Sequence, residues 1–299
     1  MAAIFGVLMP DMAAGQTDYR NIDSGRPVRI GDAVPTERNS LELNLTTARV
    51  DRLTLGRYRL QLEPRLAYGI LPRTEISLRA PVYFYERSLS PRAGVAGLGL
   101  GGEHQLNMET LRIPALAIGT EVFFPMGPAA TKTAYSVKGL LTKTARFGRV
   151  HINGTYGSYS IRIPPADEPI LPPLHGPCTY MVPTSGPTVR FLCSVPQSAV
   201  VNASNSSGAV GEIRTRGQWN AGIAFDKSFA LRSLLLVADV YSQKYEGLDR
   251  PLDWTAEFGA RKQLTRMIVI DGAVGRLFTG ESRSWFATFG TTLSKPLKL

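Results

Sequence analysis

The chain has 299 residues, of which 43% are hydrophobic and only 19% are charged. Its 29 glycines and 21 prolines exclude a coiled coil or a helical bundle, because both residue types disfavour the interior of a helix. The formal net charge is +10, but the basic residues are scattered and accompany no nucleic-acid-binding motif, so we expect no nucleic-acid partner. A basic balance also suits a surface that faces anionic lipid headgroups.

The N-terminal region begins with an apolar stretch, residues 2–9, followed by the small residues Ala13, Ala14 and Gly15. This pattern is typical of the second half of a signal peptide, so residues 1–15 are either a truncated signal peptide of a protein exported in a Gram-negative bacterium or a disordered tail. Residues 16–38 are then a polar lead-in to one domain, residues 39–299. Beyond the N-terminal stretch the longest aliphatic run, residues 234–238, is far too short for a membrane helix.

Twelve segments of period-two alternation follow along the chain. The tenth, for example, sets Trp254, Ala256 and Phe258 on one face against Asp253 and Glu257 on the other. Such alternation predicts strands with one apolar face. The segments run approximately over residues 40–50, 57–69, 73–86, 93–106, 111–124, 132–145, 149–160, 213–226, 231–245, 251–264, 266–277 and 283–295.

The connections between these segments alternate in length. Those near residues 71–72, 108–109, 147–148, 227–228 and 264–265 are short, whereas the others include the long stretch 161–213. Short periplasmic turns and longer extracellular loops are typical of an outer-membrane β-barrel. Alternation alone also fits a soluble β-sandwich, which buries its apolar face.

Aromatic residues decide between the two architectures. They share the apolar phase and, except for one tryptophan nearer mid-strand, lie at the ends that adjoin the longer loops. A membrane interface explains such a girdle, and a sandwich core does not. We therefore predict an all-β, twelve-stranded antiparallel transmembrane β-barrel in the bacterial outer membrane. The girdle comprises Tyr58, Phe84, Tyr135, Tyr156, Trp219, Trp254 and Trp285.

The region around the second and third segments carries two recognisable runs, Leu-Glu-Pro-Arg-Leu at residues 62–66 and Leu-Pro-Arg-Thr-Glu-Ile-Ser-Leu at residues 71–78. With these runs, the chain resembles the bacterial outer-membrane barrels of the MetA-pathway of phenol degradation family, best over residues 35–160. The resemblance implies an outer-membrane barrel with a role in the passage of aromatic or other poorly soluble compounds.

The polar face of the segments is rich in charge. Charged side chains that face lipid at mid-strand would each cost about 2 to 4 kcal/mol for Arg or Lys, so they must line the interior. They form either a polar pore with binding positions or a filled barrel in which acids and bases pair across strands. The arginines of the second and third segments are expected to form a basic stripe opposite a mainly acidic wall. The candidate pore-lining residues are Glu42, Arg59, Glu63, Arg65, Glu75, Arg79, Glu103, Glu121, Lys138, His151, Asp239, Glu257, Arg261 and Asp271.

The sequence contains no enzyme or cofactor motif in the structural context that such a motif requires. The glycine-rich run at residues 97–102 fits a dinucleotide fingerprint in letters only, since the alternation continues through it and no helix follows. The histidines lie on different segments, and neither His104 nor His151 has a serine two residues away, as the barrel phospholipases require. We expect no enzyme activity, no metal and no cofactor.

The long stretch 161–213 is predicted to be one extracellular loop, too polar and too proline-rich to add strands. It contains both cysteines, Cys178 and Cys193, which an exported protein would join in a disulfide. The overall hypothesis is a porin-like passive channel or uptake protein for small aromatic or apolar compounds, with outer-membrane lipid and lipopolysaccharide as its other partners. The alternatives are a non-conducting structural or adhesive barrel and, third, a soluble sandwich that binds a ligand.

Overall fold

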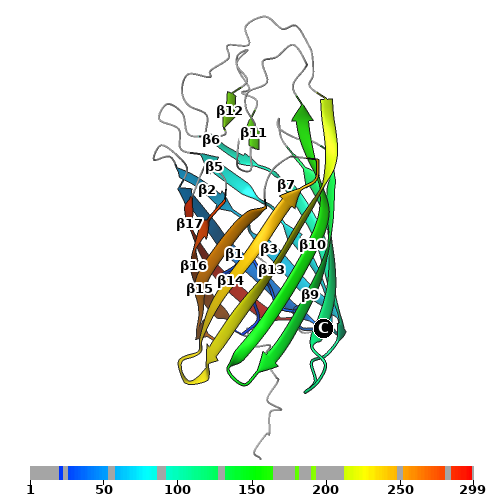
Figure 1. Cartoon of the computed structure of the whole chain (residues 1–299). Helices are drawn as coiled ribbons and strands as arrows, with labels where there is room; N and C mark the ends of the chain where they lie inside the picture. Colours follow the sequence, from blue (N-terminus) through cyan, green and yellow to red (C-terminus); the bar gives the residue numbers. More distant parts are fainter. Residues whose placement is uncertain are drawn as a thin grey trace, which may run out of the picture.

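The computed structural model describes residues 20–22, 26–52, 58–85, 92–126, 132–163, 179–181, 190–192, 212–247, 252–279 and 284–297. Twelve antiparallel wall strands close into one barrel, with the two ends of the sheet joined where β1 pairs with β17 (Figure 1). This confirms the predicted fold. The described residues contain no helix that is long and apolar enough to cross a membrane.

Nine wall strands are continuous, and three consist of two pieces each. The pieces are β2 (Tyr58–Leu62) with β3 (Arg65–Leu71), β4 (Thr74–Arg79) with β5 (Val82–Tyr85), and β6 (Arg92–Val95) with β7 (Gly97–Asn107). The continuous strands are β1 (Ser40–Arg52), β8 (Ala115–Pro125), β9 (Ala134–Ala145), β10 (Gly148–Ile163), β13 (Glu212–Phe229), β14 (Leu234–Tyr245), β15 (Asp253–Thr265), β16 (Ile268–Leu277) and β17 (Trp285–Pro296).

Two of the three breaks lie at prolines, which cannot donate to a strand ladder. Pairing nevertheless continues across them, because the carbonyl oxygen of Pro64 accepts from the Ala80 N–H at 3.1 Å and that of Pro81 accepts from the Ala96 N–H at 2.8 Å. The regular strand pairing is therefore interrupted at these positions, but the wall remains hydrogen-bonded across them.

Side chains alternate between the outside and the lumen as the sequence predicts. On β15, Trp254 and Phe258 are exposed on the outer face, whereas Glu257 and Arg261 are buried on the inner face. A soluble sandwich would show the reverse, since its apolar face would be buried. This burial pattern is that of an outer-membrane barrel.

The five short connections lie together at one end of the barrel, which we call the short-turn end (Figure 1). They span residues 72–73, 108–114, 146–147, 230–233 and 266–267. The second is longer than predicted, because β8 begins only at Ala115. The fourth lies later than predicted, because β13 continues to Phe229 and a single 3-10 turn, Ala230–Arg232, then reverses the chain through Ser233 with φ of 46°.

The long stretch contains strand structure, and the prediction that it would add none was wrong. Thr179–Met181 (β11) pairs with Arg190–Leu192 (β12) in a separate two-stranded sheet. Neither strand contains a proline, so all their residues keep the backbone N–H that a strand ladder needs. Cys178, Cys193 and the N-terminal residues 1–15 lie outside the described residues.

Candidate functional site in the barrel lumen

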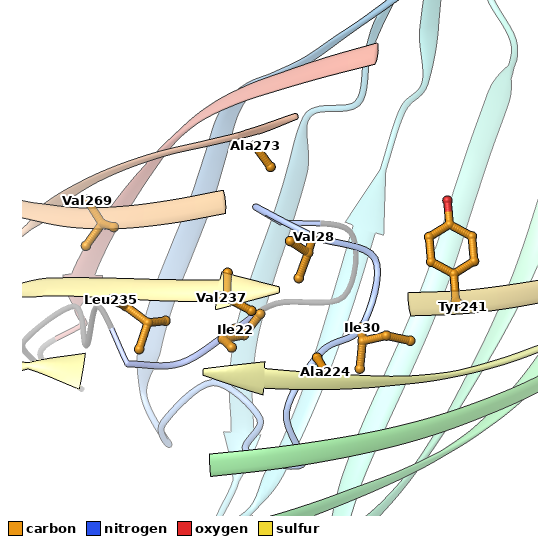
Figure 2. Close-up of a cluster of buried hydrophobic side chains, with 9 residues drawn as sticks. All are labelled: Ile22, Val28, Ile30, Ala224, Leu235, Val237, Tyr241, Val269 and Ala273. Carbon is orange, nitrogen blue, oxygen red and sulfur yellow. The ribbon is translucent and has the colours of Figure 1, made fainter. Parts of the chain in front are cut away.

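The lumen contains the N-terminal segment of the chain itself. Residues 20–22 and 26–39, which we call the plug, precede β1 and lie inside the barrel (Figure 2). The sequence suggested only a polar lead-in here. Ile30 is 2% exposed and Ala33 is completely buried, although neither belongs to a helix or strand. The barrel wall supplies their surroundings.

An apolar cluster holds the plug against the wall near the short-turn end. Ile22, Val28 and Ile30 of the plug pack against inward-facing residues of three strands, β13, β14 and β16 (Figure 2). Burial of aliphatic side chains stabilises this contact by about 25 cal/mol per Å² of apolar surface removed from water. The wall residues of the cluster are Ala224, Leu235, Val237, Tyr241, Val269 and Ala273.

The plug ends where the chain crosses β3 to enter β1. Asn39 donates its backbone N–H to the carbonyl of Gly69 at 2.8 Å. A Cβ at position 69 would lie 1.9 Å from the carbonyl oxygen of Glu37. Only glycine permits this crossing, which fixes the C-terminal end of the plug on the wall.

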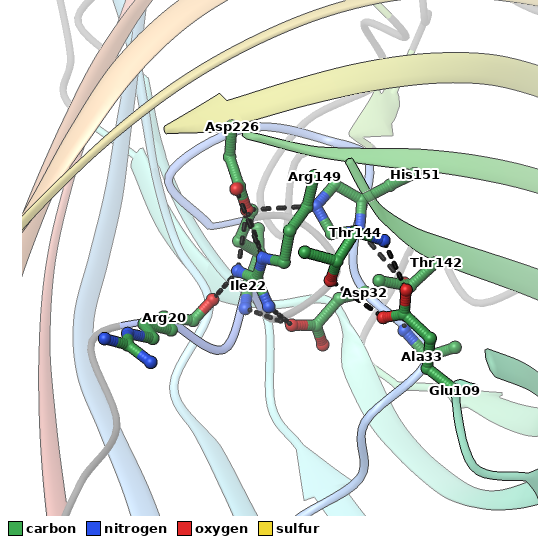
Figure 3. A network of polar contacts seen from close by, with 10 residues as sticks. All are labelled: Arg20, Ile22, Asp32, Ala33, Glu109, Thr142, Thr144, Arg149, His151 and Asp226. Atoms are coloured by element: carbon green, nitrogen blue, oxygen red, sulfur yellow. Dashed lines mark hydrogen bonds and ion pairs between the residues drawn. The ribbon is translucent and has the colours of Figure 1, made fainter. Parts of the chain in front are cut away.

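A guanidinium clamp fastens the plug to β10 and β13 (Figure 3). Arg149 lies 2.6 Å from the carboxylate of Asp226 on the wall and 3.4 Å from that of Asp32 on the plug. It also donates to the backbone carbonyl of Arg20. Asp32 in turn accepts the N–H of Ile22 at 3.1 Å. Charge-assisted bonds of this kind are about twice as strong as neutral ones.

A hydroxyl, an imidazole and a carboxylate stand in line beside the clamp. Thr142 Oγ1 lies 3.0 Å from His151 Nδ1, and His151 Nε2 lies 3.0 Å from Asp226 Oδ2. This resembles the order of a hydrolytic triad, but all three side chains are buried. The hydroxyl oxygen also accepts the N–H of Ala33 at 2.9 Å, and Arg149 occupies the carboxylate. The group therefore anchors the plug.

Three acids that were predicted to line a pore accept bonds from the plug. Asp239 on β14 stands directly opposite Glu257 on β15. They accept the backbone N–H groups of Ile30 at 3.0 Å and of Arg29 at 2.7 Å. On the other side of the lumen, Glu75 accepts both the N–H and the hydroxyl of Thr36, at 2.9 and 2.8 Å.

The strands that close the barrel hold the plug as well. The Arg26 guanidinium donates to the hydroxyl of Thr292 and lies 3.7 Å from the Asp271 carboxylate. Thr288 donates its hydroxyl to the carbonyl of Pro27 at 3.0 Å. With these contacts, anchors on β4, β9, β10 and β13 to β17 surround the plug and connect it to most of the wall.

Ion pairs within the wall occupy much of the remaining inner charge. Arg79 bridges Glu63, at 2.6 Å, and Glu121. Lys138 lies 2.6 Å from Glu103. Arg79 stands opposite Gly99, where a Cβ would lie 2.8 Å from its Cγ. The glycine-rich run therefore leaves room for the arginine to lie along the wall.

Arg65 and Arg79 of the predicted basic stripe stand directly opposite each other, but acids are interleaved with them on the same strands. Arg65 pairs with Glu75 on the adjacent strand, just as Arg79 pairs with its neighbours. The side chain of Arg59 lies outside the described residues. Glu42 and Arg261 lie at positions whose side chains face the lumen. That these residues line a passage stays a prediction.

Three arginines lie over aromatic rings inside the barrel, a feature that sequence reasoning missed. The guanidinium carbon is 5.8 Å from the ring centroid for Arg29 over Tyr241, and it is 3.6 Å for Arg49 over Phe286. Arg79 adds a third pair, over Phe123 at 5.4 Å. Arg29 is exposed on the plug, and its guanidinium group also interacts electrostatically with the carboxylates of Glu63, Asp239 and Glu257.

Six of the seven aromatic residues predicted to form the girdle have described side chains, and these six lie on the outer face. All of them with described side chains are exposed except Trp219, which is half-buried. The side chain of Phe84 lies outside the described residues. Contact of this set with a membrane interface remains an expectation. The exposed members are Tyr58, Tyr135, Tyr156, Trp254 and Trp285.

Within the described ranges, no group of three or more His, Cys, Asp or Glu side chains could hold a metal ion. Neither a protein-family model nor a curated protein sequence matches the chain. An outer membrane channel from Pseudomonas putida F1 has a similar structure, with a TM-score of 0.57 and 10% identity over 91% of this chain and 99% of that one.

The translocator domain of the autotransporter NalP from Neisseria meningitidis is also similar, with a TM-score of 0.50 and 8% identity over 86% of this chain and 89% of that one. At such low identity the likeness concerns the fold, which is that of outer-membrane barrels. Membership of the phenol-degradation family stays a prediction.

Proposed function

We propose that the protein is a passive outer-membrane channel for small aromatic or apolar compounds and that the plug restricts its lumen. The arginine–aromatic pairs inside the barrel carry this proposal. A guanidinium plane stacks on aromatic rings, and the exposed guanidinium of Arg29 offers such a plane at the surface of the plug. Because wall carboxylates neutralise Arg49 and Arg79, the stacked pairs provide flat surfaces without a strong net charge.

Planar-bilayer recording with the purified full chain tests this function. We expect a small ion current that phenol reduces more than cyclohexanol does at equal concentration, because only phenol can stack. Arg29→Ala removes the exposed plane and should abolish the difference. Arg38→Ala is the matched control, since Arg38 is exposed on the same segment but lies where the chain crosses to the wall. Equal block by both compounds would refute the aromatic preference.

A non-conducting barrel is the second candidate, and the plug itself favours it. Anchors on eight wall strands and the ion pairs within the wall connect many of the inward-facing side chains, and such networks rigidify a structure when fully satisfied. In that case, neither the full chain nor its Arg29 variant would pass current. Absence of current in every recording would therefore overturn the channel proposal.

A further inference from the structure

The five short turns share a pattern that neither the barrel wall nor the plug requires. Each turn carries one arginine, and each arginine is exposed at the short-turn end. Within the described part of the chain, none of the five guanidinium groups has a hydrogen bond or an ion pair, and Arg146 alone lies over a ring, that of Phe147 at 5.9 Å. We call this set the turn rim: Arg73, Arg112, Arg146, Arg232 and Arg266.

An exposed apolar side chain lies next to each rim arginine or within two residues of it. Leu111 is 99% exposed, Leu231 is 105% exposed and Phe147 is 70% exposed. Leu71 and Met267 are exposed at the remaining two turns. Such exposure is unfavourable in water. It suits an interface where apolar groups enter the hydrocarbon and long basic side chains extend back to the headgroups.

The charge of the turns is almost entirely positive. Their only carboxylate, Glu109, lies 3.2 Å from Lys143 and accepts the N–H and hydroxyl of Thr144 at 2.6 and 2.8 Å. Partial burial opposes ionisation, but the bonds from Thr144 and Lys143 hold the pKa of Glu109 below its ordinary value. Glu109 is therefore ionised and already occupied at neutral pH, which leaves the five arginines for an external anion.

We propose that the turn rim binds the phosphate headgroups of anionic phospholipids in the leaflet that surrounds the short-turn end. Guanidinium groups bind phosphate through two parallel N–H bonds. A lipid fits better than a protein partner, because the exposed apolar side chains are distributed over all five turns, with three of them at the second turn, around the barrel end. Protein interfaces instead use contiguous apolar patches. Since short turns face the periplasm, this leaflet is the inner one of the outer membrane.

The test reconstitutes the full chain into phosphatidylcholine vesicles that contain phosphatidylglycerol as one lipid in five. Spin-labelled forms of the two lipids report which of them the barrel retains at its surface. We expect preference for phosphatidylglycerol at low salt and its loss near 1 M salt, where the Debye length is about 3 Å. A rim variant with Arg112→Gln, Arg232→Gln and Arg266→Gln should lower the preference, by at most about fivefold per arginine.

A variant with Arg52→Gln, Lys132→Gln and Lys244→Gln is the matched control. It removes the same charge from exposed positions at the opposite ends of the strands. It should keep the preference for phosphatidylglycerol, and unchanged gel mobility without boiling should show that both variants are folded. Equal loss in both variants, or no loss in the rim variant, would overturn the proposal. So would a rim variant that keeps its lipid preference but loses a cross-linked periplasmic protein.

Discussion

Replacement of Ile30 by alanine should release the plug while leaving the barrel intact. Ile30 is 2% exposed and packs within the apolar cluster, whereas its backbone bond to Asp239 does not depend on the side chain. Ile→Ala changes at buried sites cost about 2 to 5 kcal/mol. At 1.36 kcal/mol per factor of ten, the undocked population should rise by roughly thirtyfold to several thousandfold.

Hydrogen exchange measured on a peptide that covers residues 26–39 follows this release directly. The N–H groups of Ile30, Ala33 and Thr36 are bonded to the wall, so their exchange requires the plug to open. Val34→Ala is the matched control, because Val34 lies on the same segment but is 38% exposed. Unchanged exchange in the Ile30 variant, or equal acceleration in both variants, would refute the reasoning. Faster exchange in the wall strands would indicate global unfolding instead.

Three further predictions concern the clamp, the turns and the long loop. Arg149→Met leaves two carboxylates without their cation and should lower the free energy of unfolding by about 3 to 5 kcal/mol. The urea concentration at the midpoint of the gel-mobility shift should fall accordingly. Arg146→Met, at an exposed turn position, is the control and should leave this midpoint unchanged. The pKa of Glu109 is lowered in the folded chain, so its stabilisation of the second turn should be present above the unfolded value of about 4.3 and lost as pH falls through the folded value. Exchange at that turn should accelerate in acid, and Glu109→Gln should remove the step; a step that persists would contradict this assignment. Trypsin fragments of the long loop should stay linked until reduction if Cys178 and Cys193 form a disulfide, whereas thiols that can be titrated on intact cells would exclude it.

The wall could be predicted from the sequence because each strand carries its own signal. Alternation from Trp254 to Arg261 fixes both the strand and its two faces, and the short connections then give the order of pairing. The broken strands were harder to predict, since prolines such as Pro64 lie inside continuous alternation and interrupt the ladder without ending the strand.

The plug could not be predicted because its apolar residues follow neither the spacing of a helix nor that of a strand. Its bonds run from backbone N–H groups to acids that are far away in sequence, such as Asp239 and Glu257. One signal was available in residues 234–238, where both faces are apolar. Leu235 and Val237 point inward and are buried, and an apolar inner face requires a cover. Likewise, Thr142 on β9 lies directly opposite His151 on β10. A search for serines close to His151 in the sequence does not detect this contact.

Single-channel conductance of the full chain, compared with a variant that lacks residues 16–38, tests the central claim most directly. The account predicts a small conductance with the plug in place and a much larger one without it, because the plug lies in the lumen and is anchored to the wall around it. Equal conductance of the two proteins would contradict the claim that the plug restricts the passage. No conductance from either would contradict the claim that a passage exists.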